Sequence, residues 1–305
     1  MLFNKTTFLI IGGTGFIGHA LAKKLIDRGN EVYSFSQKNP KVERKISKVI
    51  YLKGSIKNLS NLKKVFKKKI FDHVINCGGY VEHKDKKEIE DTHYKGSKNL
   101  YDYFKEKNLR SFVQIGSSSE YGNTRVPHSE GSECKPKGLY GKFKLKATKF
   151  FMYRFKNKKF PVTVLRFYQV YGPHQDFNRF IPQLIKSSLL KKKFETTLGK
   201  QFRDFLFIDD AVNAIIKACI KKESKGHIIN IGQGKGTQLK KIMLYIKKKN
   251  KFLKPVFGKI KIRADEKILV YPSISKAKKI LNWSPKTSII KGLEITNRYY
   301  KKKLF

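Results

Sequence analysis

The sequence predicts an α/β protein with a Rossmann-like, doubly wound parallel sheet and a smaller α/β domain built mainly from the C-terminal third. Two observations lead to this prediction. Strand-like and helix-like segments alternate through the first half of the 305-residue chain, and this alternation is typical of a parallel sheet with helices on both faces. A glycine-rich turn also joins the first strand to the first helix, a frequent beginning of doubly wound folds.

The order of the elements follows from the apolar runs and the breaks between them. We expect strands at 8–11, 31–35, 49–52, 73–76, 111–115, 161–167 and 228–231, and helices at 16–28, about 59–69, 88–107 and 140–157. Because strand 228–231 should return to the sheet, the smaller domain should be discontinuous. The expected domains are therefore 1–172, completed by about 205–232, and 173–204 together with 233–305.

The first turn is suited to bind the pyrophosphate of a dinucleotide. Four apolar residues, Phe8 to Ile11, are followed by Gly12, Gly15 and Gly18 and then by a helix-like run. A helix that starts directly after a strand points its free N–H groups and its positive dipole end toward the turn. Glycines let the backbone approach a phosphate closely. The spacing departs from the commoner G-x-G-x-x-G, so the prediction depends on the strand and helix around the glycines.

The chain carries a formal net charge of +45, from 68 Lys and Arg against 23 Asp and Glu. Such a charge is typical of proteins that bind nucleic acid or an anionic surface. However, only ten of the basic residues are arginines, and the lysines are spread over the whole length. Nucleic-acid binders more often gather arginines and aromatic residues in one patch. We therefore expect no specific nucleic-acid partner, and a general field that favours anionic substrates.

Cysteine, histidine and apolar patterns exclude other classes of protein. Three widely separated cysteines, Cys77, Cys134 and Cys219, suit neither a disulfide framework nor a cysteine-rich metal site. The histidines do not stand at metal-ligand spacing from acids or cysteines, so no metal is expected. No apolar run approaches the ~20 residues of a membrane span, and the N-terminal residues lack the layout of a signal peptide. These features predict a cytoplasmic protein without a membrane span.

The end of the second strand bears on cofactor preference. Sites that prefer NAD usually place an Asp or Glu there to accept a hydrogen bond from the ribose 2′-hydroxyl, whereas NADP sites avoid the acid and offer a cation. Here Ser36, Gln37 and Lys38 follow the strand, with Arg44 beyond, and no carboxylate directly follows it. This pattern favours NADP(H) slightly; the alternative is that Lys38 is one more surface lysine.

A serine-rich turn and a Tyr-x-x-x-Lys pair predict chemistry on a hydroxyl or ketone. The fifth strand leads into three serines at 117–119, and Tyr140 and Lys144 follow in the next helix-like segment. Residues four apart share one face of a helix, and a lysine ammonium near a phenol stabilises the phenolate, so the phenol can act as acid or base near neutral pH. A serine hydroxyl could bind the same substrate oxygen. This trio suits hydride transfer with a nicotinamide cofactor.

The motifs occur in the order that they have in one enzyme family. The chain resembles the extended short-chain dehydrogenase/reductase family, in its branch of nucleotide-sugar epimerases, dehydratases and reductases, and the likeness covers nearly the whole length. It rests on GGTGFIG at 12–18, the serine run followed by Glu120-Tyr121-Gly122, YGKFK at 140–144, LRFYQVYGP at 165–173, RDFLFIDD at 203–210 and SKAKKILNWSP at 275–285.

The resemblance implies an NAD(P) cofactor and a set of residues that contact it. The glycine turn would contact the pyrophosphate, and the backbone after the fourth strand would lie beside the cofactor. Lys144 would bind the nicotinamide ribose and tune Tyr140. The implied cofactor-binding residues are Gly12, Gly15, Phe16, Ile17, Ser36, Lys38, Ser55, Ile56, Cys77, Gly78, Gly79, Tyr140 and Lys144.

The resemblance also implies roles toward a nucleotide-diphosphate sugar. Tyr140 would be the proton donor or acceptor, and Ser118 the hydroxyl partner, although Ser117 or Ser119 could take that place because the turn is one residue shorter than usual. Substrate would be bound by Ser118, Asn178, Arg179, Arg203 and Arg263, with the last two arginines on the diphosphate. Guanidinium groups suit phosphates. The alternative for Arg203 is a structural pair with Asp204 or Asp209.

Some residues depart from the family pattern. Ser55 stands where Asp is common, and Gln169 and His93 stand where Asn is common. Glu120 falls near the glutamate that dehydratases use, but Ser119 replaces the Asp that precedes it in sugar 4,6-dehydratases. Elimination needs both a base and an acid, so dehydration is less favoured.

These implications together define the expected function. We expect reversible hydride transfer at C4 of a nucleotide-diphosphate sugar: an epimerase if NAD is tightly held, or a 4-ketoreductase if NADPH exchanges. The alternatives are a 4,6-dehydratase that uses Glu120 and a non-catalytic protein that senses NADP(H). The resemblance also suggests a homodimer joined through the long helices near 88–107 and 140–157.

Overall fold

The computed structural model describes residues 6–80, 85–262 and 266–305. Its centre is a seven-stranded, fully parallel sheet in the order β11-β6-β5-β4-β1-β2-β3. The strands are β1 (Thr7–Ile11), β2 (Glu31–Ser36), β3 (Ile50–Lys53), β4 (His73–Asn76), β5 (Ser111–Ser117), β6 (Val162–Phe167) and β11 (Ile228–Ile231). The doubly wound parallel sheet predicted from the sequence is confirmed.

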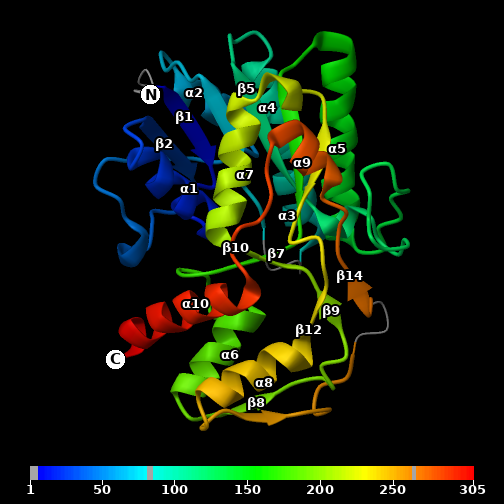
Figure 1. The fold of residues 1–305 in the computed structure, drawn as a ribbon. Coiled ribbons are helices and arrows are strands. Elements are labelled where there is room, and N and C mark those ends of the chain that lie inside the picture. The colour runs from blue at the N-terminus through cyan, green and yellow to red at the C-terminus, as the bar shows by residue number, and fades with distance from the viewer. Residues whose placement is uncertain (1–5, 81–84, 263–265) are drawn as a thin grey trace.

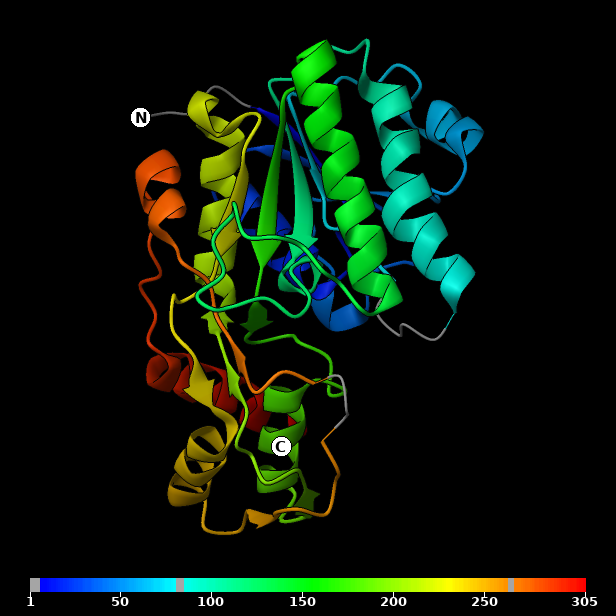
Figure 2. The ribbon, with the colours of Figure 1, turned by 90° about the vertical axis from the view of Figure 1, so that its right-hand side faces the viewer.

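Helices cover both faces of this sheet, as Figures 1 and 2 show. One face carries α1 (Phe16–Ile26) and α7 (Ile208–Ile220), and the other carries α2 (Leu59–Phe66), α4 (Gly96–Phe104) and α5 (Leu139–Lys158). The side chains of β1 alternate between two cores, with Phe8 and Ile10 on the α1 face and Leu9 and Ile11 on the α5 face. This period of two is the geometry of a strand buried on both sides.

A second lobe lies beyond the carboxyl ends of the strands, at the bottom of Figure 1. It holds α6 (Phe180–Leu189), α8 (Leu239–Lys249) and α10 (Ile289–Leu304), with β8 (Lys193–Glu195) paired to β13 (Lys254–Val256). We call these elements the C-terminal lobe. The chain enters the lobe after β7 (Gln169–Tyr171), returns to the sheet for α7 and β11, and enters the lobe again. The expected return of 228–231 to the sheet is confirmed, because β11 pairs with β6.

Smaller pairings connect the sheet to the lobe. The short strand β10 (Phe205–Phe207) pairs with β7, while β9 (Phe202–Arg203) lies between β12 (Thr237–Gln238) and β14 (Leu269–Val270). These segments of two or three residues are too short to leave a periodic signal in the sequence, so they were not predicted.

The expected helix over 88–107 has three parts. It consists of α3 (Lys86–Glu90), a π-helical turn η2 (Asp91–Lys95) and α4. Short π segments are often found at functional sites, and this one buries His93 beneath the ring of Tyr140. Within 6–80, 85–262 and 266–305, no helix combines the length and the apolar character needed to cross a membrane.

Candidate functional site

The glycine turn closes tightly between β1 and α1. Gly12 has a φ of +75°, and a Cβ there would lie 3.0 Å from the backbone of Cys77, so the turn favours glycine at this position. The Gly15 N–H donates to the Gly12 carbonyl at 3.0 Å, and Gly15 then caps the start of α1. The first N–H groups of α1 are therefore directed at the turn, which is the arrangement that binds phosphate.

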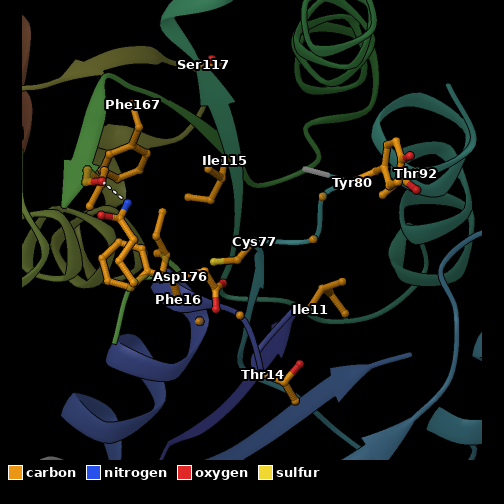
Figure 3. A pocket seen from close by; sticks show the side chains of 18 of the residues that line it. Ile11, Thr14, Phe16, Cys77, Tyr80, Thr92, Ile115, Ser117, Phe167 and Asp176 are labelled. Atoms are coloured by element: carbon orange, nitrogen blue, oxygen red, sulfur yellow. Dashed lines mark hydrogen bonds between the residues drawn. The ribbon is translucent and has the colours of Figure 1, made fainter. Parts of the chain in front are cut away.

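A cavity of about 730 Å³ opens beside this turn, at the carboxyl ends of the strands. This is the size of a small-molecule or cofactor site. Figure 3 shows its wall, with Phe16, Cys77, Ile115 and Phe167 among the labelled side chains. The residues predicted from the sequence that line it are Gly12, Gly15, Phe16, Ile17, Ser36, Lys38, Ile56, Cys77, Gly78, Gly79, Tyr140, Asn178 and Arg179.

Two residues predicted to bind the cofactor do not line this cavity. The Ser55 hydroxyl accepts a hydrogen bond at 3.1 Å from Nε2 of Gln37, and Gln37 itself lines the cavity. The Lys144 side chain is only 4% exposed, and its Nζ donates to the Ile115 carbonyl at 2.8 Å. The lysine therefore lies beneath the cavity floor rather than in it.

Tyr140 stands where the large cavity meets a second one of about 260 Å³, and it lines both. It lies in the first turn of α5, and the Lys144 Nζ is 5.9 Å from the centre of its ring. The neighbouring Gly141 allows α5 to approach the serine turn, because a Cβ there would lie 2.5 Å from the Ser119 carbonyl oxygen. The His93 ring contacts the Tyr140 ring edge-on, with 5.0 Å between centroids.

The three serines of the turn separate into different environments. The Ser117 hydroxyl accepts the Ser119 N–H at 3.1 Å and so caps a short 3₁₀ turn, η3 (Ser118–Glu120), on the side of the large cavity. Ser118 and Ser119 line the second cavity beside Tyr140. Among the described residues, no hydrogen bond to the Ser118 hydroxyl is found, which leaves this hydroxyl available to a ligand.

Glu120, the candidate acid of a dehydratase, is instead part of the core. Its carboxylate is completely buried and lines neither cavity. One oxygen accepts the Ser117 N–H at 2.8 Å, and the other accepts hydrogen bonds from Thr148 Oγ1 and Arg166 Nε, both at 2.8 Å. Both oxygens of Glu120 are therefore engaged by the protein itself and lie away from both cavities, and a catalytic part for Glu120 stays a prediction that this geometry does not favour.

The second cavity is polar and carries charges of both signs. Arg203 lines it, and its Nη2 is 2.7 Å from the Glu266 carboxylate, so Glu266 is an ion-pair partner that the sequence did not reveal. The Asp204 carboxylate accepts N–H groups from Gln233, Gly234 and Lys235 at 2.7 to 3.2 Å. Burial raises the pKa of Asp204 to about 7, although these N–H groups oppose the shift. Arg263 lies outside the described residues.

The Cys77 thiol lies in the wall of the large cavity. Burial raises the pKa of the Cys77 thiol to about 12, against the opposing charge of Lys144, so Cys77 lines the cavity as an unreactive thiol and not as a nucleophile.

Among 6–80, 85–262 and 266–305, the acids, histidines and cysteines form no cluster that could hold a metal ion.

Sequence reasoning missed several lining residues. Tyr168 and Gln169 line both cavities, and Asp176 lines the larger one; Gln169 was noted only as a departure from the family pattern and was given no role. The first two directly follow β6, at the same edge of the sheet as Gly12 and Ser117. The rule that ligands bind at the carboxyl ends of parallel strands could have found them. Nothing local marks Asp176, which reaches the cavity only through the path of the chain after β7.

Comparison with known proteins places the whole chain among related folds. A family model described as NAD dependent epimerase/dehydratase family matches residues 8–232. The UDP-glucuronate 4-epimerase of Thermodesulfobacterium geofontis is 27% identical over 97% of both chains.

Two solved structures superpose closely. A UDP-glucuronic acid 4-epimerase from Bacillus cereus, solved with UDP-glucuronic acid and NAD, is 27% identical, with a TM-score of 0.88 over 98% of this chain and 100% of its own. A UDP-glucose 4-epimerase from Thermotoga maritima, solved with UDP-glucose, has a TM-score of 0.92 over 98% of this chain and 100% of its own; at 24% identity it supports the fold alone.

Proposed function

This chain belongs to the NAD dependent epimerase/dehydratase family, and on that premise we propose that it is a UDP-sugar 4-epimerase that works by reversible hydride transfer at sugar C4. The observation that carries the proposal is the position of Tyr140, on the boundary between a cavity of cofactor size and a second, polar cavity. A proton acceptor at this boundary can contact a hydroxyl of a sugar in one cavity while the hydride moves toward the other.

Tyr140, Lys144 and Ser118 would each have a distinct role in the reaction. Tyr140 accepts the proton of the C4 hydroxyl and later returns it to the C4 oxygen, and the buried ammonium of Lys144 stabilises the phenolate between these steps. The Ser118 hydroxyl donates to the same oxygen. A bound nicotinamide would supply the acceptor that takes the C4 hydride and gives it back to the opposite face of the sugar. Net inversion at C4 then needs no added oxidant or reductant.

Both the sheet domain and the C-terminal lobe would take part in binding the cofactor and the sugar nucleotide. The glycine turn and the ends of β2 and β4 would hold the dinucleotide, with Ser36 and Lys38 at its adenosine ribose. Arg203 would contact the diphosphate of the substrate from the second cavity, and Asn178 and Arg179 would approach it from the C-terminal lobe. The sugar nucleotide would thus be bound mainly by 173–204 and 233–305.

The cofactor is proposed to be NAD. The similar B. cereus epimerase was solved with NAD, and the preference for NADP(H) inferred from the end of β2 has no support from the comparisons. The Ser36 hydroxyl accepts the Thr14 N–H at 3.3 Å, so its second lone pair is open to a ribose hydroxyl. Exchange of NADPH would instead make the same site a 4-ketoreductase, and the test below separates the two.

The test starts with the purified protein. We expect denaturation to release NAD⁺ or NADH, identified by mass spectrometry, and we expect the loaded protein to convert UDP-glucose or UDP-glucuronate to the C4 epimer without added cofactor. Retention of NADPH, or a need for it as reductant, would support the ketoreductase. Failure to convert any sugar nucleotide of a UDP, dTDP, GDP and CDP panel, despite bound cofactor, would favour the sensor.

The variant Tyr140→Phe tests the mechanism directly. Turnover should fall by about 10²- to 10⁴-fold, while the retained cofactor should match wild type. Tyr153→Phe is the matched control, because Tyr153 lies on the same helix and is 59% exposed. Unchanged turnover in Tyr140→Phe would reject the mechanism.

A homodimer through α4 and α5 is part of the proposal. These helices lie side by side on one face of the sheet in Figure 2, and light scattering should give twice the mass of one chain. A monomeric mass would remove this part without affecting the chemistry.

A further inference from the structure

The connection between β2 and β3 is fastened to the chain that follows β7. This connection contains a short 3₁₀ turn, η1 (Val42–Arg44), and Arg44 is only 5% exposed. The Arg44 guanidinium donates to the Asp176 carboxylate at 3.1 Å and to the His174 carbonyl. The Lys41 ammonium meets the same carboxylate at 2.6 Å. One segment of the sheet domain is therefore tied to the segment that enters the C-terminal lobe.

The same guanidinium also reaches the glycine turn. Its Nη1 lies 3.4 Å from the Thr14 carbonyl, between Gly12 and Gly15. Arg44 therefore joins three segments that are far apart in sequence: the glycine turn, the β2–β3 connection and 174–176. Asp176 itself lines the large cavity and is among the side chains labelled in Figure 3. Arg44 does not line the cavity, so it acts on a ligand there only through the segments that it holds.

Further contacts around Arg44 join the sheet domain to the segment 174–176 and to α10. The His19 ring of α1 lies 4.7 Å from the ring of His174, and His174 Nδ1 is 3.0 Å from the Tyr299 hydroxyl of α10. The Glu43 carboxylate pairs with Lys303 of α10 at 2.8 Å. Burial lowers the pKa of His174 to about 4, so this ring is neutral at physiological pH and adds no charge to the contact.

We propose that Arg44 and Asp176 form a clamp that holds the glycine turn against the entrance to the C-terminal lobe and thereby slows release of the bound dinucleotide. This inference rests on the proposed cofactor site. An epimerase needs the same cofactor molecule to take and return the hydride, so it gains from a slow release, whereas a ketoreductase must exchange its cofactor at every turnover. The clamp therefore favours the epimerase between the two reactions.

The sign of the effect distinguishes a clamp from simple electrostatics. Asp176 is a carboxylate in the wall of a cavity that would hold an anionic pyrophosphate. If it acted only by charge, Asp176→Asn would remove a repulsion and slow cofactor release. If Asp176 is one half of a clamp, the same variant loses the partner of the buried Arg44 and release becomes faster. Asp176 and Lys41 are each about half exposed in this pair, so Arg44 should carry most of the effect.

The experiment measures release of ¹⁴C-labelled NAD⁺ from the loaded full-length protein after a chase with excess unlabelled NAD⁺. We expect Asp176→Asn and Arg44→Met to release the label about tenfold faster or more, and Asp176→Glu to restore part of the slow release. Asp27→Asn is the matched control, because it removes a carboxylate from the exposed Lys23–Asp27 pair of the same domain. Its release rate should match wild type.

A double-mutant cycle checks that the two residues act as one unit. Asp176→Asn combined with Arg44→Met should release NAD⁺ no more than about twofold faster than either single variant, because the second change removes nothing more. Effects that multiply, slower release in Asp176→Asn, or unchanged release in both variants would overturn the clamp. If wild-type protein binds no NAD⁺ at all, the proposed function fails and the clamp with it. Circular dichroism confirms that each variant is folded.

Discussion

The Glu120 carboxylate accepts a hydrogen bond from Arg166 Nε at 2.8 Å, and both side chains are inaccessible to solvent, with 0% and 1% exposure. Glu120 is the last residue of the serine turn that follows β5, and Arg166 lies on the neighbouring strand β6. The pair therefore anchors the turn that presents Ser118. A carboxylate with this task is held in place by the core and is not free to move a proton on a substrate.

Glu120→Gln should destabilise the protein. The variant leaves the Arg166 charge buried without a counter-charge, and breaking a buried pair in this way costs about 3–5 kcal/mol. Urea unfolding checks this, with Glu133→Gln as control, since the Glu133–Lys135 pair is exposed. At a temperature where Glu120→Gln is still folded, turnover should persist. Loss of turnover in a fully folded variant would restore Glu120 as a catalytic residue.

Asp210 should matter for folding and its neighbour Asp209 should not. The Asp210 carboxylate is buried and accepts the N–H groups of Lys286 and Thr287 at 3.0 and 2.9 Å, which holds the segment before α10 against α7. In Asp210→Asn an amide NH₂ would face one of these N–H groups, so stability should fall by about 1–3 kcal/mol. Asp209→Asn changes an exposed residue one position earlier. Equal stability of the two variants, measured by denaturant unfolding, would contradict this role.

Arg203→Met should weaken binding of the sugar nucleotide and leave the cofactor in place. Arg203 lines the second cavity but not the large one, so its loss removes a charged contact to the diphosphate of the substrate, together with the ion pair to Glu266, and no contact to the cofactor. The Kd for UDP-glucose should rise about tenfold, measured by calorimetry on loaded protein. Lys200→Met, which changes an exposed lysine nearby, is the control. An unchanged Kd would assign Arg203 to its ion pair with Glu266 alone.

His73 should make the fold sensitive to acid. The ring is buried between Phe8 and the Ser111 hydroxyl, and burial lowers its pKa from 6.5 to about 4. The folded pKa is below the unfolded one, so the stabilisation is present above pH 6.5 and is lost as the pH falls toward 4. The His73→Phe variant has no ring that titrates at this position. When the pH is lowered from 7.5 to 5, the free energy of unfolding of the wild type should therefore fall by about 1–2 kcal/mol more than that of the variant.

The comparison of the two proteins isolates His73 from other titrating groups. Asp204, whose pKa is raised, titrates in the same pH range with the opposite sign, but it does so equally in both proteins. A stability difference that stays constant with pH would contradict the prediction.

Local pattern was enough to predict the sheet, the glycine turn and the helix that carries Tyr140 and Lys144. The strands at 73–76 and 228–231 occur where the apolar runs placed them, because a buried parallel strand must be apolar on both faces. The glycine turn and the Tyr140–Lys144 spacing are also local, since a turn and one helical face are defined by neighbouring residues. The glycine turn and Tyr140 line one cavity because parallel strands end at one edge of the sheet, whereas Lys144 does not line it.

Long-range contacts were beyond the reach of pattern. The role of Glu120 depends on Thr148 and Arg166, which lie 28 and 46 residues away. The ion pair of Arg203 depends on Glu266, 63 residues away, rather than on the adjacent Asp204. Residue type alone did not distinguish a catalytic or binding role from a structural role for these carboxylates, because an acid in a motif can contact a substrate or form an ion pair in the core.

The sequence by itself determined the fold, the glycine turn and the phenol–lysine pair, because each is encoded within a few turns of chain. Only the tertiary structure decided that Glu120 belongs to the core, that Tyr140 stands between two cavities, and that Arg44 is joined to Asp176. The physical reason is that burial and ion pairing depend on which distant segments meet. In this chain, the order of the strands and the repeated passage of the chain between the sheet and the C-terminal lobe determine which distant segments contact each other.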